Sequence, residues 1–278
     1  SVDAEPTRIA GYVALAAAQV KPWSVEQAVK TIEDGLARDP TGVEGYAEWG
    51  DLYADAHRLP EALQVYAHGL DRIPGAASLL AKRGDAVVGE VQRLKAMLHA
   101  AVADLTLAQA RVEKFTHSPK KAAEAQGDVE AAQAEVDRAQ SAYDKAFLTL
   151  SDAGEDYRKA LVLDPANEAA LLGMGRIATL SGRLGEGLRY FEKAASAHPD
   201  SAQALILEGE TLLDLGRADD ARARFQSALR LSPLSAGASR GLLRTNRSSK
   251  KLNAQTATQD IRYSEDEWRE PMRKLRRQ

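Results

Sequence analysis

Apolar and small residues recur along the chain at fixed distances before a series of prolines. Helical patterns end shortly before Pro40, Pro74, Pro165, Pro199 and Pro233, and three of the four intervals are 34 residues. Proline stops a helix because it lacks the backbone N–H and disfavours a helical predecessor. The fourth interval, from Pro74 to Pro165, is 57 residues longer than the others. The pattern therefore predicts five copies of a 34-residue unit, one of which carries an insertion.

Each unit repeats the same alternation of small and large residues. A small residue stands twelve and five positions before the proline, and a large apolar residue stands eight positions before it. We expect paired helices to approach closely at the small residues, while the large side chains fill the space between neighbouring pairs. The large residues are Ile32, Tyr66, Tyr157, Phe191 and Phe225. A further small residue lies upstream in each unit, at Ala16, Gly50, Gly84, Gly175 and Gly209.

This pattern resembles the tetratricopeptide repeat, a helix–turn–helix unit of 34 residues. The best match is Tyr46, Trp49, Gly50, Tyr53, Ala62, Tyr66, Gly69 and Pro74. The resemblance covers about 9–87 and 150–246, with a capping helix at 236–246, and departs from the family at Gln19 and Gly187. It implies an all-α, right-handed superhelical solenoid whose concave groove binds peptides or helices of partner proteins.

The 57 extra residues predict an antiparallel coiled-coil hairpin. Apolar residues at alternating spacings of 3 and 4 are typical of a heptad seam, and Ser118 and Pro119 suit the start of a helix. In an antiparallel helix pair, the residue numbers of facing residues add up to a constant. Phe115 with Ala122 and Gly84 with Ala153 give the same sum, so we expect one helix pair to continue from the repeat into the hairpin. About 30 residues outward give an arm on the order of 45 Å at ~1.5 Å per residue. The outgoing seam is Val91, Leu94, Leu98, Ala101, Leu105, Ala108, Val112 and Phe115, and the return seam is Ala122, Ala125, Val129, Ala132, Val136, Ala139, Tyr143, Ala146 and Leu150.

These patterns divide the chain into four segments. Residues 1–87 hold two repeats and the first helix of the third, and residues 88–149 form the hairpin. Residues 150–246 hold the second helix of the third repeat, two further repeats and the capping helix. Residues 247–278 form a linker and a basic C-terminal tail.

Charged residues occupy the slots that the resemblance assigns to the groove. Four acidic residues gather in the N-terminal half, which suits a basic or neutral ligand and would attract one through its field. A merely solvated face is the alternative. The charged groove residues are Glu44, Asp51, Asp55, Asp85, Arg176 and Glu210.

The tail carries basic and aromatic residues together. From Arg244 onward there are ten basic and five acidic residues, against a net charge of −3 for the whole chain. Trp and Tyr are typical of binding segments, so the tail either anchors on a partner subunit or this protein's own repeats, or remains solvated. An external complex is preferred, because self-docking would block the groove. The candidate contacts are Tyr263, Trp268, Arg273, Lys274, Arg276 and Arg277.

Composition excludes several classes of site. The 278 residues include no cysteine, which removes disulfides, cysteine-based zinc sites and a cysteine nucleophile. The five histidines are scattered, and no phosphate-binding loop or nucleophile elbow is present. We therefore predict no enzyme activity, cofactor, metal or small-molecule substrate, and consider nucleic-acid binding a poor option. The chain begins at Ser1 without a signal-peptide pattern or an apolar run that could span a membrane, so both cytoplasm and periplasm stay open.

Three classes of function fit these expectations. The first is a non-catalytic scaffold or adaptor subunit that joins partners through groove, hairpin and tail. The second is an assembly factor or chaperone, which would form transient complexes. The third is an accessory subunit of a bacterial envelope secretion, polysaccharide-export or motility machine. A full-length gene start, with or without a signal peptide, would distinguish the third class from the first.

Overall fold

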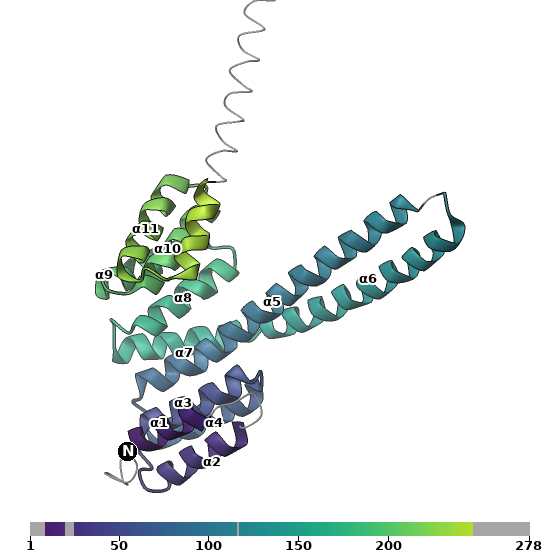
Figure 1. Ribbon diagram of the computed structural model, residues 1–278. Helices are drawn as coiled ribbons and strands as arrows, with labels where there is room; N and C mark the ends of the chain where they lie inside the picture. Colours follow the sequence, from purple (N-terminus) through teal and green to yellow (C-terminus); the bar gives the residue numbers. More distant parts are fainter. Residues whose placement is uncertain (1–8, 20–24, 116, 247–278) are drawn as a thin grey trace, which may run out of the picture. The chain divides into compact units, whose positions relative to one another are not determined.

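The computed structural model describes residues 9–19, 25–115 and 117–246, and these residues form helices, turns and loops with no β-strand among them. The chain divides into two compact units, residues 1–177 and 178–278, and each is described by itself. The predicted all-α fold is confirmed for the described part of the chain (Figure 1).

Unit 1 is built from helices that pair in sequence order. Helix α1 packs on α2, α3 on α4, and the first part of α5 on α7. Helix α8 (Glu168–Leu180) begins in unit 1 and crosses the boundary. The other bounds are α1 Ile9–Gln19, α2 Val25–Leu36, α3 Val43–Asp55, α4 Leu59–Arg72, α5 Ala77–Lys114, α6 Pro119–Phe147 and α7 Leu150–Leu163.

Unit 2 contains α9 (Leu184–Ala197), α10 (Ala202–Asp214) and α11 (Ala218–Leu231), followed by a helix over 236–246. This last helix coincides with the predicted capping helix. The ring of Phe225 on α11 lies against Gly209 of α10 and Gly241 of the last helix, where an added Cβ would stand 2.8 and 2.3 Å from ring atoms. The capping helix therefore covers the aromatic residue that the final repeat would otherwise leave open.

The small and large positions of the repeat form the interior of both units. Tyr66, Tyr157 and Phe225 are fully buried, and Ile32 and Phe191 are buried with them. The ring of Tyr157 lies between Gly84 and Gly173, where an added Cβ would approach it to 2.7 and 2.1 Å. Such distances exclude any side chain, so the glycines are needed for the close approach of neighbouring helices.

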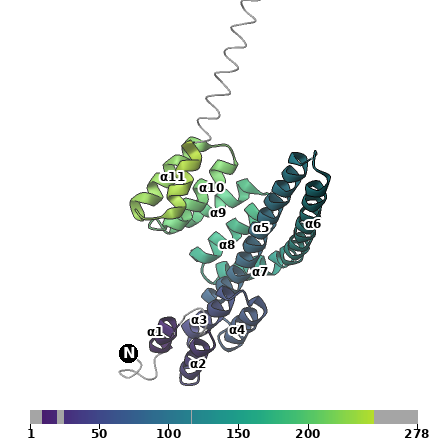
Figure 2. The ribbon, with the colours of Figure 1, turned by 45° about the vertical axis from the view of Figure 1, so that its right-hand side comes forward.

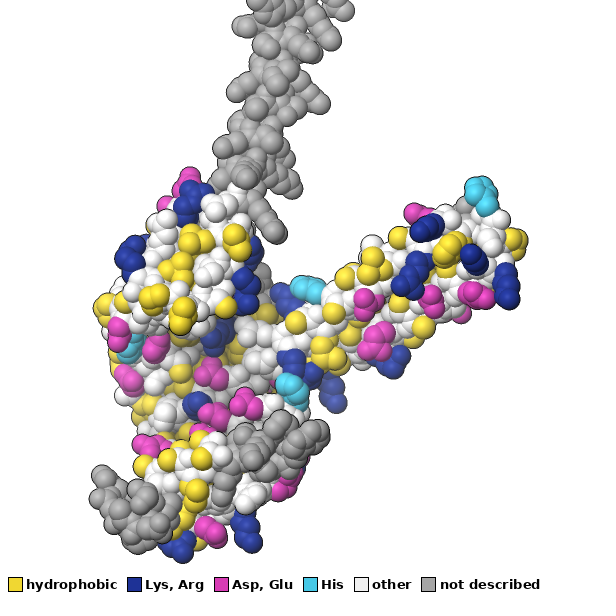
Figure 3. All heavy atoms as spheres, in the orientation of Figure 1, with side chains coloured by type: hydrophobic (Ala, Val, Ile, Leu, Met, Phe, Trp, Pro, Cys, Tyr) yellow, Lys and Arg dark blue, Asp and Glu magenta, His cyan; other side chains and the backbone are white. Residues whose placement is uncertain are grey.

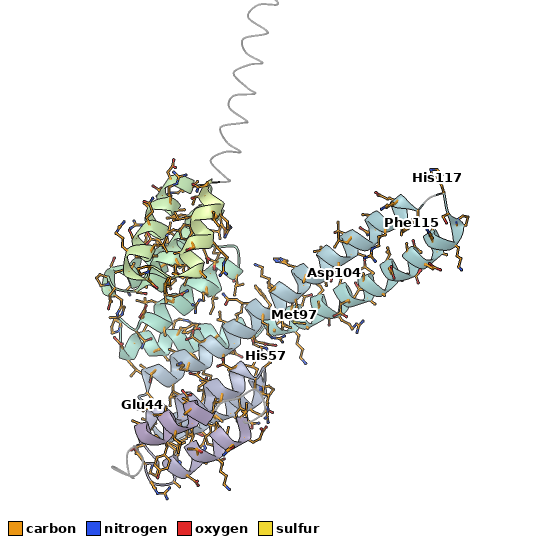
Figure 4. The ribbon with its side chains drawn as sticks, in the orientation of Figure 1. Glu44, His57, Met97, Asp104, Phe115 and His117 are labelled. Carbon is orange, nitrogen blue, oxygen red and sulfur yellow. The ribbon has the colours of Figure 1, made fainter. Side chains whose placement is uncertain are left out.

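The insertion forms a hairpin of two long helices within unit 1. Helices α5 and α6 run side by side to the tip, as Figures 1 and 2 both show. Figure 4 places Met97 and Asp104 in turn along α5, Phe115 directly after the end of α5 and His117 at the tip. All seam positions predicted on the two helices are buried or half-buried, and the buried ones between the base and the tip are alanines: Ala101, Ala108, Ala125 and Ala139. An antiparallel hairpin therefore projects from the third repeat, as the heptad pattern predicts.

The return helix departs from the prediction of a continuous helix pair. Helix α6 ends at Phe147, and α7 begins at Leu150 after a two-residue turn. The Thr149 hydroxyl donates to the Ala146 carbonyl at 2.7 Å, and the Thr149 N–H donates to the same carbonyl at 3.0 Å. Threonine competes for a helix carbonyl in this way and locally tightens or bends the helix. The outgoing helix is continuous across the base of the hairpin, whereas the return helix is broken there.

Candidate partner-binding site

The main candidate site is a cavity of about 460 Å³ in unit 1, which we call the arm-base cavity. Helix α3 contributes Asp51 and Asp55, and α4 contributes Tyr66. Helix α5 contributes Lys82 and Asp85 from the repeat. Three of the acidic residues predicted for the groove, Asp51, Asp55 and Asp85, therefore line one cavity.

The hairpin supplies part of the cavity wall. Helix α5 does not end near Val87, as the first helix of a single repeat would, and its next turns add Gly89, Glu90 and Arg93 to the lining. The insertion therefore changes the groove as well as projecting from it. A ligand in this cavity would contact both the second repeat and the base of the arm.

Asp51 is bound inside a small network at the cavity floor. The buried Tyr66 hydroxyl donates to Asp51 Oδ1 at 2.6 Å, and Lys82 Nζ donates to Oδ2 at 2.5 Å. Burial, and then the charge of Asp51, raises the pKa of Tyr66. Burial is the largest single influence on Lys82 and lowers its pKa, but the hydrogen bond to Asp51 and the negative charges around Lys82 together raise the pKa above its ordinary value. Asp51 therefore anchors the Tyr66 ring that packs on Gly50.

Asp85 has the same arrangement one repeat later. The Tyr157 hydroxyl donates to Asp85 Oδ1 at 2.8 Å, and Arg176 Nη1 lies 3.8 Å from the same oxygen. Burial raises the pKa of Asp85, while the bond from Tyr157 and the charge of Arg176 oppose that change. Asp51 and Asp85 are therefore structural residues as well as cavity residues, and much of their charge is compensated within the repeats.

Of the three predicted groove acids that line the cavity, Asp55 is exposed, whereas Asp51 and Asp85 are half-buried. Asp55 belongs to the last turn of α3, one turn beyond Asp51. Half-buried Glu48 lies on the same helix face. Burial raises the pKa of Glu48, the charges of Asp51 and Asp55 raise it further, and the charge of Lys82 opposes this change. Negative charge is therefore in excess along this side of α3.

Glu90 and Arg93 form a pair at the base of the arm. Arg93 donates from Nε and Nη2 to the two carboxylate oxygens of Glu90, at 2.7 and 2.6 Å. These bonds lower the pKa of Glu90, and the proximity of His57 contributes to the same shift. His57 thus lies close enough to α5 to interact with it from the turn between α3 and α4.

His57 occupies a position that favours glycine. The φ of His57 is +59°. Gly182 and Gly216 occupy the equivalent turn position in the fourth and fifth repeats, with φ of +75° and +79°. The three turns share one hydrogen bond, in which the following arginine N–H donates to a carbonyl five residues earlier at 2.8 Å. This is the closing bond of a helix C-terminus that requires a left-handed residue. The chain therefore keeps a histidine at the cavity despite a conformational cost.

The remaining predicted groove residues lie elsewhere. Figure 4 shows Glu44 and His57 near opposite ends of α3, with His57 at the base of the hairpin, so Glu44 is not beside the cavity acids. Arg176 interacts with Asp85 but does not line the cavity. Glu210 belongs to α10 in unit 2. The tail contacts Tyr263, Trp268, Arg273, Lys274, Arg276 and Arg277 lie outside the described residues.

The outer end of the hairpin carries a second group of charges. Figure 3 shows basic side chains gathered around this end, and Arg111, Lys114, Lys120 and Lys121 are exposed there. Lys121 Nζ lies 5.6 Å from the centre of the Phe115 ring, a cation–π contact that joins the two helices near the tip. The two ends of the arm therefore differ in charge: acids predominate in the cavity at its base, and cations at its tip.

The cavity also contains His57, Glu90 and Arg93, which the sequence pattern did not indicate. Aligning the turns of the repeats would have singled out His57, because Gly182 and Gly216 occupy its position. Glu90 and Arg93 follow the end of the repeat helix, where only the continuation of α5 brings them to the groove. Within the described part of the chain, no group of three or more metal-ligating side chains could hold an ion, and no helix is long and apolar enough to cross a membrane.

Comparison with known proteins agrees with this architecture. A family model described as the tetratricopeptide repeat matches residues 149–202, 181–236 and 206–253. No relative was found among curated protein sequences. The family model therefore assigns tetratricopeptide repeats to residues 149–253, which hold the second helix of the third repeat and the whole of the fourth and fifth repeats.

Several solved structures align with most of the chain, and one of them has a TM-score above 0.5. A tetratricopeptide repeat protein of Thermus thermophilus, TTC0263, superposes with a TM-score of 0.55 at 14% identity, covering 87% of this chain and 98% of its own. The protein YrrB, described as having an unusual peptide-binding site, gives a TM-score of 0.41 at 15% identity, covering 85% and 93%. MamA gives 0.43 at 15% identity, covering 81% and 92%. Identities of this size concern the fold alone, and the fold class is that of the tetratricopeptide repeat solenoids.

Proposed function

We propose that the chain is a non-catalytic interaction scaffold that binds a basic segment of a partner polypeptide in the arm-base cavity. The hairpin and the basic end of the tail, residues 273–278, hold other subunits of the same complex. The observation that carries the proposal is the composition of the cavity wall, which joins the groove face of the second and third repeats to the base of the arm. Tetratricopeptide repeats are generally interaction modules without catalytic groups, which agrees with this assignment.

Charge favours a cationic ligand. The cavity is lined by four carboxylates, Asp51, Asp55, Asp85 and Glu90, against the two cations Lys82 and Arg93. The internal pairs use Lys82 and Arg93, and Asp55 retains an exposed carboxylate beside Glu48. A lysine or arginine side chain entering near Asp55 would relieve this excess and would be steered by it at low ionic strength.

The cavity size also suits a peptide side chain. Its volume of about 460 Å³ lies within the roughly 300–1,000 Å³ that ligand pockets span. Ala54, Leu59 and Ala86 give it an apolar part that the aliphatic stem of a lysine or arginine would cover. The geometry therefore fits one long basic side chain with its neighbouring backbone.

Two other assignments of the scaffold remain distinct hypotheses. An assembly factor or chaperone would release its client, so its complexes would dissociate on dilution within minutes. An accessory subunit of a bacterial envelope secretion, polysaccharide-export or motility machine would copurify with membrane fractions. Both would use the same cavity, and they differ from a stable scaffold in lifetime and location.

The experiment is affinity purification of the intact protein from its native cells, followed by cross-linking mass spectrometry. The proposal expects lysines of one partner to cross-link to acidic residues of α3 and of the first turns of α5. Asp55→Asn should then slow association with that purified partner severalfold at low salt and much less at high salt. Asp219→Asn is the matched control, because Asp219 is an exposed helix carboxylate in unit 2. Equal association rates for Asp55→Asn and the unsubstituted protein across the salt series would remove the cavity from the proposal.

A further inference from the structure

A second cavity in unit 1 lies away from the arm-base cavity. Its volume is about 550 Å³, and it is bounded by the end of α4, the start of α5 and the end of α7. Leu70, Leu80, Val162 and Leu163 supply apolar walls. We call it the α4–α7 pocket, and it shares no lining residue with the arm-base cavity.

The α4–α7 pocket carries exposed apolar side chains that the repeat pattern does not require. Val162 is 81% exposed and Leu163 is 50% exposed, although both belong to the last turn of α7. A large apolar residue three positions before the repeat proline is peculiar to this repeat. The equivalent residues of the other repeats are Ala37, Asp71, Ser196 and Arg230. Exposed apolar groups beside a concave surface are typical of a binding site.

The rim of the pocket is charged, and part of it is fixed. Arg83 donates to both carboxylate oxygens of Asp156, at 2.7 and 2.5 Å, which holds its guanidinium against α7. Arg158 and Lys159 are exposed cations of the rim, and Asp71 and Glu155 are exposed anions. A complementary ligand would therefore present apolar side chains together with charges of both signs.

We propose that the α4–α7 pocket binds residues 261–272 of this chain, either from the same molecule or from a second copy. This segment carries Ile261, Tyr263, Trp268 and Met272, and it contains both aromatic residues of the tail beyond residue 246. Tyr and Trp combine a large apolar surface with a polar edge, which suits an apolar pocket with a polar rim.

Charge supports this occupant. The acidic run from Glu265 to Glu267 lies between the two aromatic residues and matches Arg158 and Lys159, while Arg262 and Arg269 match Asp71 and Glu155. Docking here would leave the arm-base cavity open, so a bound tail and a bound partner are compatible.

The test replaces Trp268 by photoreactive p-benzoylphenylalanine in the full chain and maps the cross-links by mass spectrometry. The inference expects cross-links to peptides that contain residues 70–83 and 155–163. A mixture of light and isotopically heavy protein separates docking within one molecule, which gives no mixed products, from docking between copies, which does. Cross-links gathered in the arm-base cavity, or none above the level of unfolded protein, would overturn the inference.

Matched substitutions make the test specific. Val162→Glu should reduce the pocket cross-links at least fivefold, whereas Val102→Glu, which changes an exposed valine of the arm, should leave them unchanged. The melting temperature of each variant is checked first, and the double variant Arg158→Glu, Lys159→Glu gives an independent test with an expected loss of at least twofold. Equal cross-linking in all variants would contradict the pocket as the docking site. Because the proposed function concerns the other cavity, this outcome would leave it unaffected.

Discussion

The repeats and the arm use different interiors to hold helices together. In the repeats, fully buried aromatic rings such as Tyr66, Tyr157 and Phe225 press on glycines of neighbouring helices. In the arm, the buried seam positions between base and tip are alanines, and the larger seam residues are only half-buried. A two-helix hairpin has no third layer to cover its seam, so its side chains bury less apolar surface.

This difference indicates which part of unit 1 contributes most to its stability. The rings of Tyr157 and Phe225 each lie against glycines of two other helices. The hydroxyls of Tyr66 and Tyr157 anchor their rings through hydrogen bonds to Asp51 and Asp85. The arm is stabilised by local contacts along one pair of helices. We therefore expect substitutions in the repeats to affect the whole unit and substitutions in the arm to remain local.

The largest expected effect is that of Tyr157→Ala. Removing a fully buried aromatic side chain costs about 3–5 kcal/mol of unfolding free energy, and here it also leaves Asp85 without its hydrogen-bond donor. The arm substitution Val129→Ala, at a half-buried seam position, should cost about 1 kcal/mol. Urea unfolding followed by circular dichroism measures both, and equal costs would contradict the comparison.

The next effect has the opposite sign. His57→Gly should raise the free energy of unfolding by about 1 kcal/mol, because glycine adopts the left-handed conformation of the turn without steric cost. Gly182→Ala, at the equivalent turn of unit 2, should lower it by a similar amount. If His57→Gly weakens partner binding while it stabilises the fold, the histidine is retained for the ligand. A destabilised His57→Gly variant would show instead that the imidazole contacts outweigh the strain.

The smallest effect concerns the pair at the arm base. Arg93 holds the folded-state pKa of Glu90 below its ordinary value, so this carboxylate stabilises the fold above its unfolded pKa and loses that contribution as the pH falls through the folded value. Glu90→Gln should therefore cost roughly 0.3–0.5 kcal/mol at pH 7, as for other pairs spaced three or four residues apart on a helix. The cost should become smaller as the pH is lowered from 7 to 3. Unfolding curves of both proteins at the two pH values give the difference, and a cost independent of pH would exclude the charge as its source.

The sequence was sufficient for the fold because the fold depends on periodicity. The proline spacing predicts the helix pairs, and the alternation of 3 and 4 predicts both helices of the arm. The break at Leu148 and Thr149 escaped prediction because the return seam continues through it without a change of spacing. Its cause is a side-chain hydrogen bond from Thr149, which leaves no trace in the pattern of apolar residues.

The site was predicted less completely because its character depends on pairings across repeats. Asp51, Asp55 and Asp85 line one cavity, but Asp51 is bonded to Tyr66 and Lys82, which stand 15 and 31 positions later. A triple change of Asp51, Asp55 and Asp85 to Asn would disturb the bonds of Asp51 and Asp85 to Tyr66, Lys82 and Tyr157. Asp55 is the substitution that tests binding with least effect on the fold.

In our proposal the arm base and the repeats form one binding surface, and two deletions test this most directly. Removing residues 95–142 and closing the arm with a short turn keeps Gly89, Glu90 and Arg93 in the cavity wall, whereas removing 89–148 takes them away. Circular dichroism and melting should show the repeats folded in both. We predict that the short-armed protein binds the cross-linked partner with an affinity within twofold of the full chain. We predict a loss of at least tenfold for the armless protein. Equal affinities for the two deletion proteins would contradict the claim.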